Sequence, residues 1–171
     1  MKQSILVTYA TNYGSTQEVA EVIAETLREE GHLVDVLPVT AVSSLDDYSA
    51  IILGSAVNYG KWLPDAIEFV QANTEALKRM PVALFCVHIQ NTANDAQSRQ
   101  KRHAYLDEVR PLLSPIAEGY FAGKFDRNGS KLLLPNWMSF FIPPIDLRKW
   151  NKVRAWAVDV SKMLVTQLEA L

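Results

Sequence analysis

Short apolar runs alternate along the chain with segments in which apolar residues recur every three or four positions. The first run, at 5–7, is rich in β-branched residues and stops at the turn-forming residues 11–14, which predicts a buried strand. In the next stretch Val19, Ile23 and Leu27 recur every four residues, charged residues lie mostly off that stripe, and a glycine follows its end. This spacing predicts an amphipathic helix with a glycine stop.

The same alternation continues to the end of the chain and predicts a fold class. Further strands are predicted at 33–39, 50–53, 82–87 and 116–122, and further helices at 63–77, 101–113 and 150–168. Short strands separated by helices predict a parallel sheet covered on both faces. We therefore expect an α/β, doubly wound, five-stranded parallel sheet with strand order 2-1-3-4-5, in which the second strand lies nearest an edge.

Composition excludes several classes of protein. No repeat or polar linker divides the 171 residues, so we expect one domain over 1–171. The single cysteine, Cys86, rules out an intrachain disulfide and a cysteine-based zinc cage, and the three histidines form no metal signature. The apolar run at 5–7 is too short for a signal peptide, which predicts a cytoplasmic protein, and the net charge of -2 gives no case for nucleic-acid binding.

A ligand is expected at the carboxyl ends of the strands, in the crevice where the winding direction reverses. Three predicted loops converge there, at 11–16, 55–62 and 88–94. The first offers hydroxyls, a glycine and free helix amides to a phosphate, but neither lysine nor arginine. It matches neither a nucleoside-triphosphate loop nor a dinucleotide fingerprint, so a monophosphate ester fits better. The alternative is that Ser and Thr here merely cap the helix.

The second loop contains the segment Asn58-Tyr59-Gly60-Lys61-Trp62, with two large aromatic residues beside a glycine. Aromatic faces at this edge could stack on a planar ring system. The alternative is that Trp62 packs under the following helix.

These motifs together resemble a known family. The pattern Thr-x-x-Gly-x-Thr after the first strand, the loop at 54–62 and the order of strands and helices are similar to the flavodoxin family, whose cofactor is flavin mononucleotide (FMN). The stretch at 58–61, the start of the last helix at 150–153 and a long apolar insert most resemble its menaquinone-dependent protoporphyrinogen dehydrogenase branch.

The resemblance implies a set of cofactor-binding residues. Residues 11–16 would hold the phosphate, whereas 55–62 and the loop that begins at His88 would flank the isoalloxazine. Because the 88–94 loop contains no aromatic residue, one face of the ring is expected to be open, which favours an enzyme over a pure electron carrier. The implied residues are Thr11, Asn12, Tyr13, Gly14, Ser15, Thr16, Ser55, Ala56, Val57, Asn58, Tyr59, Gly60, Lys61, Trp62, His88, Ile89, Gln90 and Asn91.

An apolar and basic insert at about 124–149 separates the fifth strand from the last helix. From 124 to 154 there are seven Lys or Arg against two Asp, or +5, so the rest of the chain carries about -7. Such a segment suits an amphipathic anionic ligand, a membrane surface or an acidic redox partner, and we expect Trp137, Phe140 and Phe141 to contact substrate or membrane. The alternative is an ordinary cover for the sheet.

Three functions remain open at this point. The first is an FMN-dependent oxidoreductase that passes electrons from a porphyrinogen-like donor to a quinone, as the resemblance implies, with possible peripheral contact at the inner face of the membrane. The second is a flavodoxin-like carrier that docks on redox proteins. The third is a module of this fold that has lost its cofactor and only binds partners. No pair of residues identifies a catalytic acid or base.

Overall fold

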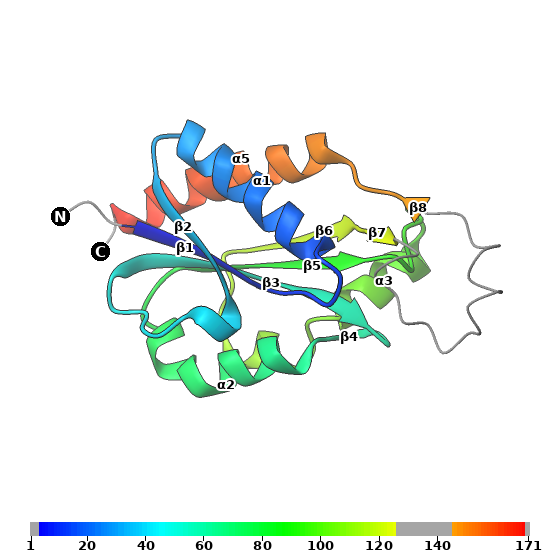
Figure 1. Cartoon of the computed structure of the whole chain (residues 1–171), viewed down its shortest axis with the longest axis horizontal. Helices are drawn as coiled ribbons and strands as arrows, with labels where there is room; N and C mark the ends of the chain where they lie inside the picture. Colours follow the sequence, from blue (N-terminus) through cyan, green and yellow to red (C-terminus); the bar gives the residue numbers. More distant parts are fainter. Residues whose placement is uncertain (1–3, 126–144, 170–171) are drawn as a thin grey trace.

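The computed structural model describes residues 4–125 and 145–169, and Figure 1 shows the arrangement of their helices and strands. The residues Trp137, Phe140 and Phe141 lie outside the described residues, as does most of the predicted insert. The strands are β1 (Ser4–Ala10), β2 (Leu33–Pro38), β3 (Tyr48–Asn58), β4 (Lys61–Trp62), β5 (Val82–His88), β6 (Ala117–Ala122), β7 (Lys124–Phe125) and β8 (Ile145–Asp146). The helices are α1 (Ser15–Glu29), α2 (Pro64–Leu77), α3 (Ala96–Ala104) and α5 (Trp150–Leu168), with 3-10 turns at Val39–Ala41 and Arg110–Leu112.

The main sheet has the order β2-β1-β3-β5-β6, and neighbours along this path are parallel. This is the predicted order of the five principal strands, and β2 is at an edge as expected. Helices α1 and α5 cover one face, and α2 lies on the other (Figure 1). The doubly wound α/β fold is therefore confirmed.

Alternation along the strands divides the core into two layers. In β5, Ala83, Phe85 and Val87 face α1 and α5, whereas Val82, Leu84 and Cys86 face α2. Because successive side chains of a strand point to opposite faces, a strand covered on both sides must be apolar throughout. The run 82–87 satisfies this requirement, and all of its residues are buried.

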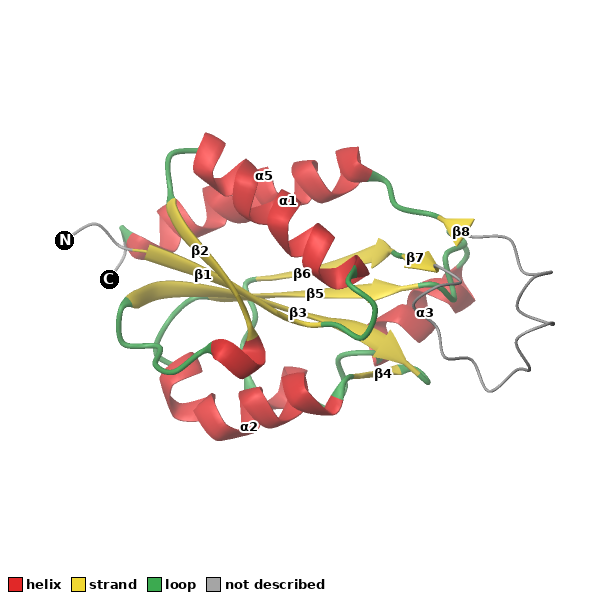
Figure 2. Ribbon diagram, in the orientation of Figure 1, coloured by secondary structure: helices red, strands yellow, loops and turns green. Residues whose placement is uncertain are grey.

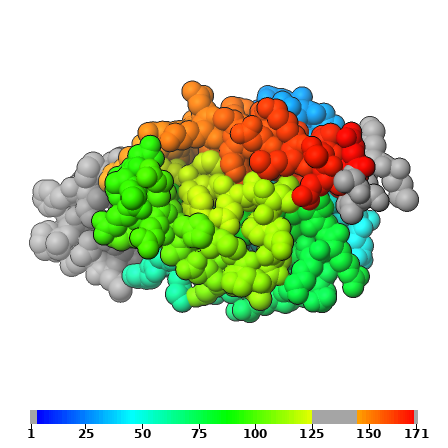
Figure 3. All heavy atoms as spheres, turned by 180° about the vertical axis from the view of Figure 1, so that it is seen from behind, coloured from blue at the N-terminus to red at the C-terminus, as the bar shows by residue number. Residues whose placement is uncertain are grey.

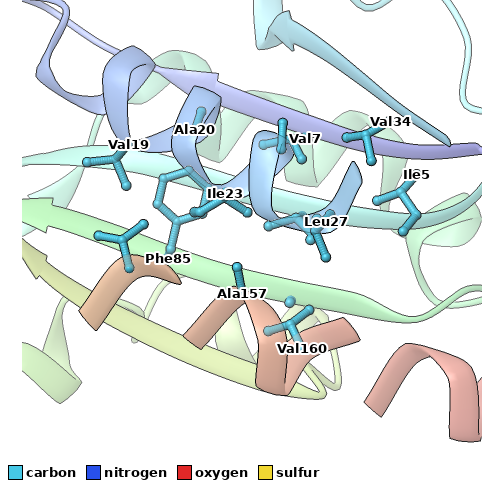
Figure 4. Packing of buried hydrophobic residues seen from close by; sticks show 14 of the residues in the cluster. Ile5, Val7, Val19, Ala20, Ile23, Leu27, Val34, Phe85, Ala157 and Val160 are labelled. Carbon is cyan, nitrogen blue, oxygen red and sulfur yellow. The ribbon is translucent and has the colours of Figure 1, made fainter. Parts of the chain in front are cut away.

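The apolar stripe predicted for helix α1 packs on the sheet, as expected. Figure 4 shows Val19, Ile23 and Leu27 directed toward Phe85 and toward Val160 of α5. The helix ends where Gly31 adopts a φ of 92°, a left-handed conformation that costs glycine little. The glycine stop is confirmed, as is the 150–168 helix.

Two segments differ from the prediction. Strand β3 extends to Asn58 and pairs with β4, so the predicted loop at 55–62 is largely a hairpin. The helix predicted at 101–113 was wrong: α3 covers 96–104, because Asp95 caps it by accepting the Ser98 amide at 2.8 Å. This helix has no buried residue, so it carries no apolar stripe by which the sequence could reveal it.

No helix in the described ranges 4–125 and 145–169 is long and apolar enough to cross a membrane.

Candidate functional site

The carboxyl ends of β1, β3 and β5 meet at one edge of the sheet (Figure 2). The three loops singled out from the sequence follow these strands, at 11–14, 59–60 and 89–95. The crevice between β1 and β3 is the point where the chain reverses its winding direction, since β2 lies on one side of β1 and β5 lies on the far side of β3. The topology thus brings the three predicted segments together.

The first loop presents uncapped helix amides. Gly14 has a φ of 86°, and its amide donates to Thr11 Oγ1 at 2.9 Å, which closes the turn before α1. No side chain among the described residues caps α1, so these hydroxyls do not serve as helix caps in this structure. The amides of the first turn remain directed into the loop, where the helix dipole favours an anion.

Two hydroxyls at the start of α1 retain hydrogen-bonding capacity that the described residues do not use. Ser15 Oγ accepts the Lys124 amide at 3.0 Å, so its own hydrogen remains available to a further acceptor. Thr16 Oγ1 is buried and has no hydrogen-bond partner among the described residues. An unpartnered buried hydroxyl is costly, which is a reason to expect a ligand group beside it.

Gly123 lies beside the candidate site, and the sequence analysis did not single it out. A Cβ there would lie 2.9 Å from Val87 Cγ1 and 3.2 Å from Ser15 Oγ. The absence of a side chain therefore allows the chain after β6 to approach α1 closely, and the Gly123 amide donates to the His88 carbonyl at 2.8 Å. The need for a glycine at this position becomes visible only in the folded chain, where Ser15, Val87 and Gly123 lie close together.

The second loop projects an aromatic ring beyond the sheet. Tyr59 and Gly60 have φ values of 50° and 78°, the positive values that a tight two-residue hairpin turn requires. Tyr59 is 94% exposed, and no atom of the described residues lies within 4 Å of the position of a Cβ on Gly60. Lys61 forms an ion pair with Glu108.

Ser55 and Trp62 serve the core in this structure. Ser55 Oγ accepts the Leu63 amide at 3.0 Å and donates to the Ala56 carbonyl at 2.8 Å, which ties the end of β3 to the start of α2. Trp62 is 3% exposed, and its Nε1 donates to Cys86 Sγ at 3.1 Å. Trp62 therefore packs into the core, as the alternative interpretation of this loop predicted. Tyr59 is the aromatic residue of the loop whose ring is accessible.

The third loop is held from behind by α3 and Tyr105. The Asn91 amide side chain donates to the Tyr105 hydroxyl at 2.7 Å, and Arg102 donates to the Asn91 carbonyl and, at 2.7 Å, to the Ala93 carbonyl. Tyr105 is buried, with its ring centroid 5.6 Å from that of His88. The loop is therefore preorganised without an aromatic residue of its own.

His88 ends β5 at this edge and is 4% exposed. Its Nδ1 lies 2.6 Å from the Gln90 carbonyl oxygen, so Nδ1 carries the proton and donates to that oxygen. Burial lowers the pKa of His88, which keeps the imidazole neutral near pH 7. The ring contributes shape and a fixed hydrogen bond here, and no positive charge.

A pH titration of unfolding tests this account of His88. Because its pKa is lower in the folded chain, the folded state opposes protonation, so its contribution to stability is complete above pH ~6.5 and is lost as the pH falls. We expect the free energy of unfolding, measured in urea, to decrease from pH 7 to pH 5, and to decrease less in His88→Gln. Burial also lowers the pKa of His32. Adding His32→Gln to the His88→Gln variant should therefore make the free energy of unfolding depend even less on pH. Identical profiles for wild type and His88→Gln would contradict the assignment.

Other groups offer little chemistry. Burial raises the pKa of the Cys86 thiol to about 12, so it is not a thiolate at neutral pH. Within residues 4–125 and 145–169 no cluster of histidine, cysteine or carboxylate side chains could hold a metal ion.

An open five-stranded sheet of this order, with an uncapped, lysine-free loop at its switch point, defines a flavodoxin-like protein. A flavodoxin from the domain Archaea has the same fold, with a TM-score of 0.60 and 15% identity over 95% of this chain and 99% of that one. The family model described as Flavodoxin domain matches residues 6–134, and the chain belongs to this family.

Sequence comparison with curated proteins finds similarity to dehydrogenases whose names specify a quinone. Protoporphyrinogen IX dehydrogenase [quinone] of Escherichia coli K12 is 29% identical over 86 residues, which cover 49% of this chain and 48% of the relative. The protein of the same name from Leishmania major is 29% identical over 124 residues, covering 69% and 53% respectively. The chain thus spans about half the length of the curated relatives it matches.

Proposed function

We propose that this protein is an FMN-dependent oxidoreductase whose cofactor phosphate is held by residues 11–16. The observation that carries the proposal is the uncapped start of α1, where free amides meet the available Ser15 hydroxyl and the unpartnered Thr16 hydroxyl. Neutral donors of this kind fit a phosphate monoester, and they lie at the crevice where such sheets bind ligands.

The remaining residues of the crevice fit the flavin ring. The Tyr59 ring can cover one face of a planar system, and Gly60, free of contacts at its Cβ position, leaves backbone room beside the ring edge. Residues 88–91 would border the opposite side, and this segment contains no Trp, Tyr or Phe that could cover the ring. When bound, the cofactor supplies the redox chemistry, and the chain supplies its placement and surroundings.

The substrates we propose are a porphyrinogen-like donor and a quinone acceptor. The names of the curated relatives support this choice, as does the 88–94 loop, which has no Trp, Tyr or Phe to cover the ring on its side of the crevice. We further propose that Trp137, Phe140 and Phe141 contact the substrate, or bring a cytoplasmic protein to the inner face of the membrane. The basic character of 124–154 favours acidic ligands and anionic surfaces.

A flavodoxin-like electron carrier is the second candidate. The observation that favours it is the exposure of Tyr13 and Tyr59 at the rim of the crevice. Exposed aromatic residues around a redox centre are suited to transient contact with a protein partner.

The first experiment is the visible absorption spectrum of the freshly purified protein. We expect bands near ~370 and ~450 nm, and release of FMN on heating. A colourless protein that also fails to take up added FMN would contradict the proposal and favour a partner-binding module.

Anaerobic turnover then separates the two redox functions. We expect the FMN-loaded protein to oxidise protoporphyrinogen when a soluble menaquinone analogue is added. If fully loaded protein shows no turnover but binds a redox protein tightly and stoichiometrically, the carrier function is the correct one.

A further inference from the structure

A cleft of about 480 Å³ opens at the free edge of the sheet, beside the candidate cofactor site. It lies where α3, the end of β6 and the start of α5 come together, and Figure 3 shows the face on which these segments meet. Tyr105, which directly follows α3, packs in the core layer that faces α2, whereas α5 packs in the opposite layer, so α3 and α5 border the cleft from different sides of the sheet. His88, one of the residues implied for the candidate cofactor site, also lines this cleft, together with Thr92 and Asn94 of the loop that follows β5.

The walls of this cleft are basic on both sides. No carboxylate lines it in the described part of the chain. Arg99, Arg102, Lys149 and Lys152 form no ion pair with any residue that the structure describes, and the two arginines donate only to backbone carbonyls. The lining cations are Arg99 and Arg102 from α3, and Lys149 and Lys152 from the start of α5, and the His103 side chain also lines the cleft.

Neighbouring charges are already matched and do not cancel this excess. Glu118 of β6 accepts from Arg110 at 2.6 Å and from the Tyr120 hydroxyl at 2.7 Å. Arg148, between the cleft and α1, is bound to Asp146 at 2.7 Å and also pairs with Glu18. Neither Glu118 nor Asp146 therefore neutralises the four cations that line the cleft.

The rest of the lining is largely apolar. Phe121 and Ala122 of β6 contribute to it, as does Leu147, which is partly exposed. The first turn of α5 contains no acidic residue and has no side-chain cap, so its amides also favour an anion. A cleft with apolar walls and unpaired cations on opposite sides fits a ligand with an apolar body and acidic groups at both ends.

We propose that this cleft binds an organic dianion, an apolar ring system that carries two carboxylates, one near the α3 cations and the other near Lys149 and Lys152. The site is separate from the 11–16 phosphate loop, and the wall formed by His88, Thr92 and Asn94 places its ligand next to the crevice. Its existence does not depend on the proposed redox function.

Calorimetric titration of the full chain, as purified, with naphthalene-2,6-dicarboxylate tests the site. We expect saturable binding with one site per chain, and at least tenfold weaker binding to the Lys149→Gln, Lys152→Gln double variant, because two charge-assisted contacts are lost. Both lysines are exposed and form no ion pair with a described residue, so the melting temperature and the FMN content should remain those of the wild type. Neither the calorimetric affinity nor the melting temperature depends on enzymatic turnover.

Two matched controls separate this site from general attraction. Lys101→Gln removes one exposed charge from α3 outside the cleft and should leave the dissociation constant unchanged. The neutral dimethyl ester and inorganic sulfate should each bind at least tenfold more weakly than the dicarboxylate. Equal binding of the ester or of sulfate, an equal effect of Lys101→Gln, or unchanged affinity in the double variant would each overturn the proposal.

Discussion

Replacement of Thr11 and Thr16 together by valine is expected to weaken FMN binding by at least a hundredfold. In the proposed site each hydroxyl would donate a hydrogen bond to a charged phosphate oxygen, and such bonds contribute about 1.5–3 kcal/mol. Thr11 additionally accepts the Gly14 amide, so its loss loosens the turn that presents the α1 amides. Fluorescence quenching of titrated FMN by the apoprotein measures the dissociation constant.

Thr8→Val is the matched control for this prediction. Thr8 is the other described residue whose buried hydroxyl lacks a partner, and it lies within β1, before the loop. Valine in its place retains the shape and removes a polar group without a hydrogen bond, so stability should be unchanged or slightly higher. If Thr8→Val weakened FMN binding as much as the double substitution, the hydroxyls of the loop would not be the phosphate ligands.

Gly54→Ala is expected to lower the free energy of unfolding by about 3 kcal/mol. A Cβ on Gly54 would lie 2.0 Å from Phe85 Cζ, on the neighbouring strand β5. The Phe85 ring is fully buried and is held between Phe121 and Trp156, at centroid distances of 6.5 and 6.3 Å. It cannot move aside without disturbing this cluster, so the strands must separate. Urea unfolding followed by circular dichroism gives the value.

A double-substitution cycle tests the cause. In a Phe85→Leu background the clash is removed, so Gly54→Ala should cost much less than it does in the wild type. Gly60→Ala serves as a control for glycine replacement in general, because nothing lies near its Cβ position and only the positive φ opposes alanine, at about 1–2 kcal/mol. Equal costs of Gly54→Ala in the two backgrounds would show that contact with Phe85 is not responsible.

Much of the fold follows from the apolar periodicity. Strands covered on both faces must be continuously apolar, as 82–87 is, and helices that pack by one face must repeat that face every three or four residues, as 150–168 does. The helix α3 lacked both signals, because none of its residues is buried. Its start depends on the Asp95 cap, a local contact that a pattern of apolar positions does not report.

The candidate site was predictable in its location but not in its details. Parallel strands bring their carboxyl ends to one edge, so segments 11–16, 55–62 and 88–91 could be assigned to one crevice. Which face Trp62 presents could not be assigned, because β3 continues into a hairpin and turns that ring into the core. Tyr105, which supports the third loop, was not singled out, since its hydroxyl meets Asn91 only in the folded chain.

The amino-acid sequence by itself determined the strand order, the two-sided burial of the sheet and the loops that meet at its switch point, because these depend on periodicity and on the general geometry of parallel sheets. Only the tertiary structure decided which hydroxyls remain unpartnered, why Gly123 must lack a side chain and where unpaired cations face one another across β6. These properties arise from contacts between residues far apart in the sequence, such as Ser15 and Lys124, and no local pattern specifies such contacts.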